Sequence, residues 1–477
     1  MSSTTQLSAR ERITALLDDN SFVEVGAFVT KRSTDFNLQQ QEVQADGVIT
    51  GYGTINGNLV YIYSQDASSM GGSVGEMHAK KIVRIYDLAL KVGAPVIGLI
   101  DSTGLRLQEA TDALNGFGEI YLKQTLALGS IVQITAIFGN CGGGLAVMAS
   151  LSDFSFMEEK NAKLFVNSPN ALASNYKEKC DTSQALFQAK NGMIDFVGEE
   201  AEVIRSIRDL ITILPANNED DASYIECTDD LNRQLTHISS ELSDTAKVLK
   251  ELSDDYYFFE TKAEFAKEMV TGFIRLNGMT VGAVANRKAC TDQDGKVIDQ
   301  FDSGLTTAGC EKASAFVNFC DAFIIPILTL TQVNGYKATV EEEKTIAKAS
   351  AKLTHAFANA TVPKVNFIIG KAFGTAYITM NSKHIGADMV FALSSAKIGM
   401  MDAGLAAQII CEGSSADIVK EKATEYDKLQ SSAEAAAKRG YVDCIIEPEA
   451  MRQHAIYSFE MLFTKRENRP AKKHGTK

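Results

Sequence analysis

A glycine-rich segment, GNCGGG at residues 139–144, follows an apolar run and precedes a stretch with helical periodicity. Glycine lets the backbone adopt conformations closed to other residues and lets a ligand approach the main chain. At the start of a helix, the N–H groups of such a segment converge on one point, with the positive end of the helix dipole behind them. The segment could therefore stabilise an oxyanion such as an enolate. A tight turn built for close packing would have the same composition.

The sequence contains these features twice. Residues 47–66 resemble residues 268–287, and residues 139–158 resemble residues 370–389. The offsets, about 220 and 230 residues, indicate a duplicated domain rather than a short repeat. The second glycine loop reads KAFGTAY and begins at Lys371. Two copies of a loop with accessible backbone predict two related binding sites, as an enzyme that carries a group between two bulky substrates needs.

A polar segment, DSTGLRLQE at residues 101–109, follows the apolar run at 94–101. Polar groups at the carboxyl end of a strand commonly face the ligand crevice of an α/β sheet. Arg106 could contact a substrate there. Alternatively, it could pair with Glu109 and orient the loop.

Two further groups of residues could bind an anion. Asp66 and residues 71–73 precede a predicted helix, where they could hold an anion or form a turn and a helix cap. Lys80, Lys81 and Arg84 share one predicted helix and could meet a phosphate. A solvated helix face is the alternative for these three cations.

The elements that must position these residues follow an α/β order. A helix is predicted at residues 8–17, with Ser8 as N-cap and Glu11 completing a capping box. Asn56-Gly57 indicates a hairpin over residues 47–65. Apolar strands then alternate with helices, which implies right-handed ββα or βαβ layering. The other predicted elements are helix 73–91, strand 94–101, helix 112–128, strand 131–139, hairpin 270–286, helix 304–321, strand 324–332, helix 340–360, strand 362–370 and helix 449–464.

Length and composition set the broad class. A chain of 477 residues fits two domains, and the acidic stretch at 217–255 predicts their junction. The net charge of −13 argues against a nucleic-acid partner or an anionic membrane surface. The eight cysteines lack metal or disulfide spacing, and neither a secretory leader nor a membrane-length apolar run occurs. We therefore expect a cytoplasmic protein without membrane insertion or a metal site, whose chemistry uses backbone donors.

Ordered sequence blocks carry a family resemblance over nearly the whole chain. With these blocks the sequence resembles the carboxyltransferase subunits of biotin-dependent acyl-CoA carboxylases, transcarboxylases and sodium-pumping acyl-CoA decarboxylases. The blocks are ARERITALLDDNSFVEVG (9–26), DGVITGYGTINGNLVYIYSQD (46–66), GGSVGE (71–76), GAPVIGLIDSTGLRLQE (93–109), QITAIFGNCGGG (133–144), VNFCDAFIIPILTL (317–330), ATVPKV (360–365) and KAFGTAYITMNSKHIGAD (371–388).

The resemblance implies a fold and a division of labour. The fold would be α/β, with two tandem crotonase-like domains that each have a ββα superhelix core. Residues 1–235 would bind acyl-CoA, and residues 236–477 would bind biotin. A carboxyl group would move between biotin and the α carbon of the thioester at a site between subunits. The oligomer would be a hexamer made of two trimers.

The resemblance also implies the site residues. Backbone N–H groups of Gly143 and Gly144 would stabilise the enolate of the acyl-CoA, and those of Thr375 and Ala376 would stabilise the enolate of biotin. The other residues that we expect to contact substrate or biotin are Gly71, Gly72, Ser73, Arg106, Gly142, Gly374, Tyr377 and Ile378.

The second loop departs from the family's usual R-K-A-Y-G-G-A-Y. Gly370 stands in place of the arginine, Phe373 in place of a tyrosine and Thr375 in place of a glycine. A Met-Lys-Met biotinylation site and a biotin carboxylase region do not occur. The implied partners are therefore a separate biotin carrier protein, with either a biotin carboxylase or membrane decarboxylase subunits. Malonyl-, methylmalonyl- and glutaconyl-CoA are all candidate substrates.

Two other functions stay open. A biotin-independent, crotonase-type acyl-CoA decarboxylase would use the first loop only. A scaffold subunit whose second loop has lost catalysis would organise the carrier subunits. The direction of carboxyl transfer is open as well, because the half-reaction is reversible.

Overall fold

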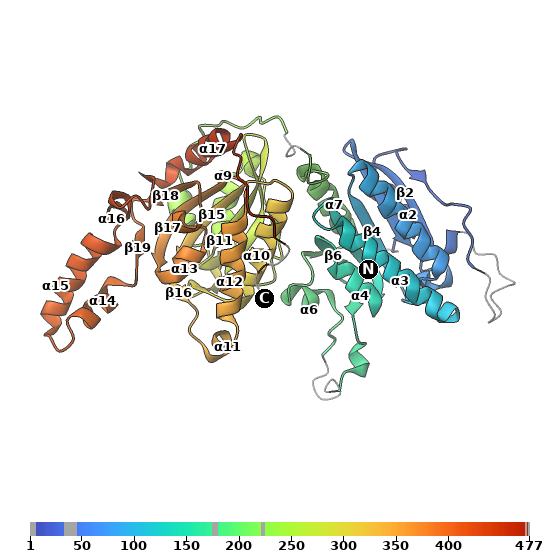
Figure 1. Ribbon diagram of the computed structural model, residues 1–477, viewed down its shortest axis with the longest axis horizontal. Coiled ribbons are helices and arrows are strands. Elements are labelled where there is room, and N and C mark those ends of the chain that lie inside the picture. Colours follow the sequence, from blue (N-terminus) through green and yellow to red (C-terminus); the bar gives the residue numbers. More distant parts are fainter. Residues whose placement is uncertain (1–5, 33–44, 174–179, 221–224, 473–474, 476–477) are drawn as a thin grey trace. The chain divides into compact units, whose positions relative to one another are not determined.

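The computed structural model describes residues 6–32, 45–173, 180–220, 225–472 and residue 475. The chain divides into two compact units, unit 1 (Met1–Ser223) and unit 2 (Tyr224–Lys477), coloured blue to green and green to red in Figure 1. This division comes earlier in the chain than the predicted boundary after residue 235. Part of the predicted junction, residues 221–224, lies outside the described residues.

Unit 1 is built on one mixed sheet. Its first strands are antiparallel, and all later pairings are parallel. The predicted hairpin is confirmed, since Asn56 and Gly57 both have positive φ (49° and 83°), as the tightest hairpin turns require. The sheet order is β1 (Val23–Glu24), β2 (Val48–Ile55), β3 (Asn58–Gln65), β4 (Val96–Ser102), β5 (Gln133–Gly142), β6 (Phe154–Glu158) and β8 (Phe196–Gly198), with β7 (Lys163–Phe165) paired to β5.

Unit 2 repeats this sheet. Its hairpin turns through Asn277 and Gly278, again with positive φ (50° and 76°). The doubled α/β fold is thus confirmed. The sheet order is β20 (Cys444–Ile446), β18 (Met389–Leu393), β17 (Lys364–Phe373), β15 (Ile327–Val333), β11 (Met279–Asn286), β10 (Met269–Leu276) and β9 (Phe259–Thr261), with β19 (Lys397–Gly399) paired to β17. Among the described residues of unit 2, four short strands lie outside this sheet: β12 (Ala289–Thr291), β13 (Val297–Gln300), β14 (Gly304–Leu305) and β16 (Gly335–Tyr336).

Helices pack on both sheets, and their apolar faces form one core in each unit. In the described part of the chain, none is both long enough and apolar enough to cross a bilayer. Unit 1 contains α1 (Ala9–Leu16), α2 (Glu76–Val92), α3 (Ala110–Ala127), α4 (Gly144–Ser150), α6 (Ala185–Lys190) and α7 (Glu200–Ile213). Unit 2 contains α8 (Ile238–Glu241), α9 (Thr245–Leu252), α10 (Thr307–Ala322), α11 (Val340–Glu343), α12 (Ile346–Asn359), α13 (Gly374–Thr379), α14 (Ala403–Ile410), α15 (Ala416–Tyr426), α16 (Ala433–Lys438) and α17 (Met451–Leu462).

Helix boundaries differ from the prediction where tertiary contacts intervene. The capping box of Ser8 and Glu11 is confirmed at the start of α1. Helix α2 starts later than the predicted residue 73, because the Ser73 hydroxyl accepts a hydrogen bond from a buried arginine instead of capping the helix. The helix predicted over 340–360 is two helices, α11 and α12, because Thr345 has non-helical dihedral angles at their junction.

A buried lysine occupies corresponding places in the two units. Lys81 on α2 donates to the carbonyl of Ala45, just before the first hairpin strand of unit 1. Lys312 on α10 donates to the carbonyls of Lys262 and Phe265, just before the hairpin of unit 2. Burial lowers the pKa of each ammonium group to about 8. The duplication therefore extends to polar details of the interior.

Candidate functional site

The first glycine loop joins β5 to α4. Gly143 has φ +60° and ψ −122°, a conformation that favours glycine. A Cβ atom on Gly143 would meet nothing within 4 Å, so the requirement for glycine is conformational rather than steric. The N–H of Gly143 donates to the carbonyl of Phe165 on β7 (2.9 Å).

This hydrogen bond changes the predicted donor pair. Gly143 was expected to stabilise an oxyanion together with Gly144, but its N–H is already committed to Phe165. The first N–H groups of a helix have no intrahelical acceptor. At the start of α4 these groups belong to Gly144 and Leu145, so the available pair lies one residue further along the chain than predicted.

The second glycine loop joins β17 to α13 and has the same backbone shape. Gly374 has φ +65° and follows a strand that pairs with a short parallel strand, β19, as Gly143 follows β5 beside β7. With Gly374 matched to Gly143, Thr375 and Ala376 take the places of Gly144 and Leu145. The predicted donors of the second copy thus correspond to the revised donors of the first.

A pocket of about 340 Å³ lies beside the second loop. Phe373, Met400 and Leu405 provide apolar walls, and Gly374 exposes backbone to the pocket. Lys371 and Asp402 form an ion pair at the same pocket (3.4 Å). Apolar walls with a few polar groups are typical of a small-molecule site.

Two other predicted residues of the second loop, Tyr377 and Ile378, are absent from the pocket lining. Tyr377 is 4% exposed, and burial raises the pKa of its hydroxyl to about 12. Its ring packs edge-on against His384. Ile378 is half-buried on the same short helix. Neither side chain lines the pocket beside Gly374.

Gly370, the position at which the family's arginine is missing, is crowded by a neighbouring cation. A Cβ atom on Gly370 would lie 3.1 Å from Cβ of Gln332 and 3.3 Å from Nζ of Lys288. Lys288 is half-buried, and burial followed by the charge of Lys371 lowers the pKa of its ammonium group. A positive charge is therefore present beside Gly370, although the sequence gives no signal that Lys288 supplies it.

The predicted residues of unit 1 come together at the carboxyl ends of β4 and β5. Thr103 donates its N–H to the carbonyl of Gly71 (2.9 Å), and the Ser102 hydroxyl donates to the carbonyl of Gly72 (2.6 Å). A Cβ atom on Gly104 would lie 3.8 Å from the carbonyl oxygen of Gly142. The loops at 71–73, 102–106 and 142–144 thus meet at one place.

Arg106 holds this region from inside. Its guanidinium has no exposed surface and donates to Asp46 (2.6 Å), Glu109 (2.8 Å) and the carbonyl of Ser73 (2.7 Å). A side chain so enclosed favours the alternative in which Arg106 pairs with Glu109 and orients the loop. Asp46, the other carboxylate partner of Arg106, has only a weak sequence signal, an Asp-Gly pair before the hairpin, where Asp46 has φ +49°.

His78 lies next to this charged cluster and predicts a pH-dependent stability. Burial, followed by the charge of Arg106, lowers the pKa of its imidazole from 6.5 to about 3. Between these values the unfolded chain binds the extra proton, so stability should fall as the pH drops below about 6.5, by about 1.4 kcal/mol per pH unit. Urea unfolding between pH about 7 and 5 should show a shallower pH slope for His78→Gln than for the unsubstituted protein. The exposed His237→Gln variant is the control, and an unchanged slope in His78→Gln would contradict the prediction.

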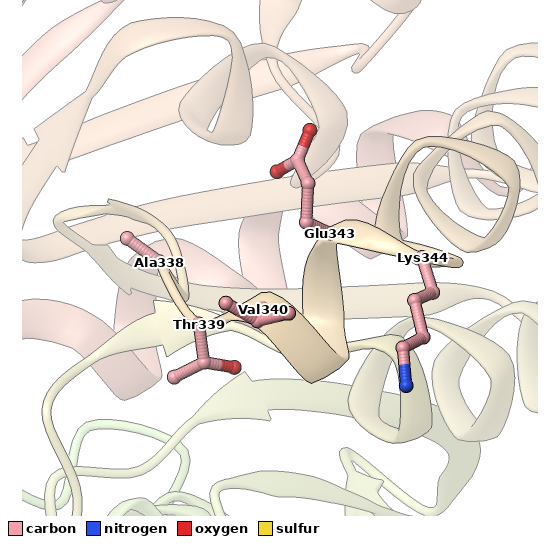
Figure 2. A pocket seen from close by; sticks show the side chains of 5 residues that line it. All are labelled: Ala338, Thr339, Val340, Glu343 and Lys344. Carbon is pink, nitrogen blue, oxygen red and sulfur yellow. The ribbon is translucent and has the colours of Figure 1, made fainter.

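An open hollow of about 430 Å³ lies apart from the glycine loops, beside α11 (Figure 2). One short segment lines it, and Glu343 and Lys344 point in different directions. Val340 is 84% exposed there. Polar groups do not converge in this hollow, so it lacks the features of a specific ligand site.

Comparisons with known proteins agree with one another. Residues 2–476 match the family described as carboxyl transferase domain. The chain is 38% identical to methylmalonyl-CoA decarboxylase subunit alpha of Propionigenium modestum, over 98% of this chain and 93% of that protein. It is also 38% identical to the propionyl-CoA carboxylase beta chain of Roseobacter denitrificans, with the same coverage. The crystal structure of transcarboxylase 12S, a hexamer with methylmalonyl-coenzyme A and methylmalonic acid bound, matches with a TM-score of 0.90 at 35% identity, over 98% of this chain and 92% of that chain.

Proposed function

The chain belongs to the carboxyl transferase family, and we propose that it exchanges a carboxyl group between carrier-bound biotin and the α carbon of a short acyl-CoA. Its fold is that of two crotonase-like domains, and it is an enzyme of carboxyl transfer. The names of its relatives support methylmalonyl-CoA and propionyl-CoA as the carboxylated and decarboxylated substrates.

The observation that carries this proposal is the pair of matching glycine turns at Gly143 and Gly374. Each turn places a helix N-terminus at the carboxyl end of a parallel strand, where its free N–H groups can stabilise negative charge. Two oxyanion sites suit a reaction in which each of two substrates develops an enolate. A decarboxylase without biotin would need only one.

In unit 1, the N–H groups of Gly144 and Leu145 would stabilise the thioester enolate. When the bond between the α carbon and the carboxyl group breaks, its electron pair moves toward the thioester oxygen, which these donors would face. In unit 2, the N–H groups of Thr375 and Ala376 would stabilise negative charge on the ureido oxygen of biotin. Bound biotin supplies a ring nitrogen that accepts or releases the carboxyl group.

The residues present in unit 2 suit biotin. The pocket beside Gly374 combines apolar walls with main-chain donors, which fits a compact ring that carries one strongly polar group. We assign acyl-CoA to unit 1 and biotin to unit 2. The partners would be a biotin carrier protein with a biotin carboxylase or with membrane decarboxylase subunits, and the location would be the cytoplasm. The hexamer of transcarboxylase 12S supports a homo-oligomer here as well.

The direct test is carboxyl release from methylmalonyl-, malonyl- and glutaconyl-CoA by the purified protein, with and without free biotin or a biotinylated carrier. We expect turnover of methylmalonyl-CoA that requires biotin, because the carboxyl group must be accepted before the enolate is protonated. Equal turnover without biotin would indicate a crotonase-type decarboxylase. Binding of the thioester without any turnover would indicate a scaffold.

A further inference from the structure

A second pocket of unit 1, of about 130 Å³, lies between α2 and the segment before the hairpin. It combines apolar side chains with three cations that lie within two turns of one helix. Its lining consists of Val25, Gly26, Val29, Thr50, Met77, Lys80, Lys81 and Arg84.

The three cations differ in their exposure and in the hydrogen bonds and ion pairs that they form within the protein. Lys81 is 5% exposed and donates to backbone carbonyls, so it is part of the framework. Lys80 is exposed and pairs with Glu76 one turn earlier on the helix. Arg84 is exposed, and within the described ranges no ion pair forms with it. An acidic protein of net charge −13 thus gathers positive charge around this pocket, and Arg84 retains its full capacity to bind an anion.

The size of the pocket restricts its occupant. Sites for whole drug-sized ligands have volumes of roughly 300–1,000 Å³. A pocket of about 130 Å³ instead accepts one group of a longer molecule. Helix α2 supplies Met77 and the three cations, and the segment before the hairpin supplies Val25 and Val29. This mixed lining suits a phosphate attached to a less polar body.

Helix α2 connects this pocket with the first glycine loop. Its N-cap, Gly75, packs against Arg106 and Glu109 beneath the loop region, since a Cβ atom there would lie 2.5 Å from each of them. Lys80 and Arg84 are five and nine residues further along α2. At a rise of 1.5 Å per residue, they lie roughly 7–14 Å from Gly75 along the helix axis. A ligand that reaches both places must be extended and must carry its phosphate far from its reacting end.

We propose that the pocket lined by Lys80 and Arg84 binds the 3′-phosphate at the nucleotide end of the acyl-CoA. The identity of the ligand rests on the proposed function, because acyl-CoA is the extended, phosphorylated substrate of that reaction. The pocket would bind the phosphate, while the first glycine loop would stabilise the thioester enolate.

Binding of CoA and of dephospho-CoA, which lacks the 3′-phosphate, tests this assignment in the full-length protein by titration calorimetry. We expect the unsubstituted protein to bind CoA at least about tenfold more tightly than dephospho-CoA, as charge-assisted hydrogen bonds to a phosphate require. Lys80→Ala combined with Arg84→Ala should weaken CoA binding to the level of dephospho-CoA and leave dephospho-CoA binding unchanged. Lys91→Ala, an exposed lysine in the last turn of the same helix, is the matched control and should behave as the unsubstituted protein.

Two outcomes would overturn the assignment. The double variant could keep its preference for CoA, or it could lose affinity for both ligands equally. Adenosine 3′,5′-bisphosphate should compete with CoA for the unsubstituted protein, whereas inorganic phosphate at the same concentration should compete far less; equal competition would reveal a general anion site. Because these measurements need no biotin and no turnover, they remain interpretable if carboxyl transfer itself is not observed.

Discussion

Replacing Gly374 with valine is expected to lower biotin-dependent carboxyl transfer by at least about a hundredfold while leaving CoA binding unchanged. Gly374 has φ +65°, a conformation that a β-branched residue strongly disfavours. The valine would force the turn into another shape, and the N–H groups of Thr375 and Ala376 would no longer point to one spot. The loss should appear in kcat for methylmalonyl-CoA with a biotinylated carrier, with the affinity for CoA measured in parallel.

Gly413→Val is the matched control for this experiment. Gly413 also has positive φ (+82°), and a Cβ atom there would meet nothing within 4 Å. A Cβ atom on Gly374 would meet only the carbonyl oxygen of Met400, at an ordinary contact distance of 3.5 Å. Both variants should therefore lose about 1–2 kcal/mol of stability from the same kind of backbone strain. Full carrier-dependent activity in Gly374→Val would contradict the role of the second loop. A comparable loss of activity in Gly413→Val would trace the effect to strain alone.

Replacing Arg106 with methionine should destabilise unit 1 by about 3–5 kcal/mol, the largest stability effect that we expect. The substitution would leave Asp46 and Glu109, both fully enclosed, without their cation. Burial already raises the pKa of Asp46 in the presence of Arg106. The measurement is the midpoint and slope of the urea transition of the full chain, followed by a probe within unit 1.

The control for Arg106 is a more exposed arginine that also contacts carboxylates. Arg32 bridges Glu76 and Asp112 with 44% of its side chain exposed, so water replaces its contacts and Arg32→Met should change stability far less. Arg106→Lys should fall between the two variants, because one ammonium group cannot reach every acceptor of the guanidinium. Equal stability of Arg106→Met and the unsubstituted protein would show that the enclosed carboxyl groups do not depend on Arg106.

The sequence predicts the features of the fold that depend on neighbouring residues. Asn56-Gly57 forms its hairpin turn because residues that tolerate positive φ are required in that turn. Ser8 and Glu11 cap their helix because both partners lie within one turn of it. The duplication can also be recognised from the sequence, because both copies retain the same local pattern of turns and apolar strands.

Features that depend on distant residues were not predictable from local pattern. The N–H of Gly143 donates to the carbonyl of Phe165, which lies on a different strand, so we propose Gly144 and Leu145 as the donor pair of the first loop. Ser73 does not cap α2, because its hydroxyl accepts a hydrogen bond from Arg106. The ammonium group of Lys288 beside Gly370 comes from the segment between β11 and β12, far from Gly370 in the sequence. In each case, an interaction across the fold decided what one residue does.

The duplication has a consequence for how the protein is made. The sheet of unit 1 is complete once β8 (Phe196–Gly198) exists, so this unit can fold while the ribosome is still producing the rest of the chain. The sheet of unit 2 ends with β20 (Cys444–Ile446), and α17 adds Phe459 to its core, so it cannot close until synthesis is nearly finished. A destabilising substitution in unit 1 should therefore impair folding during translation, whereas one in unit 2 should impair folding after translation.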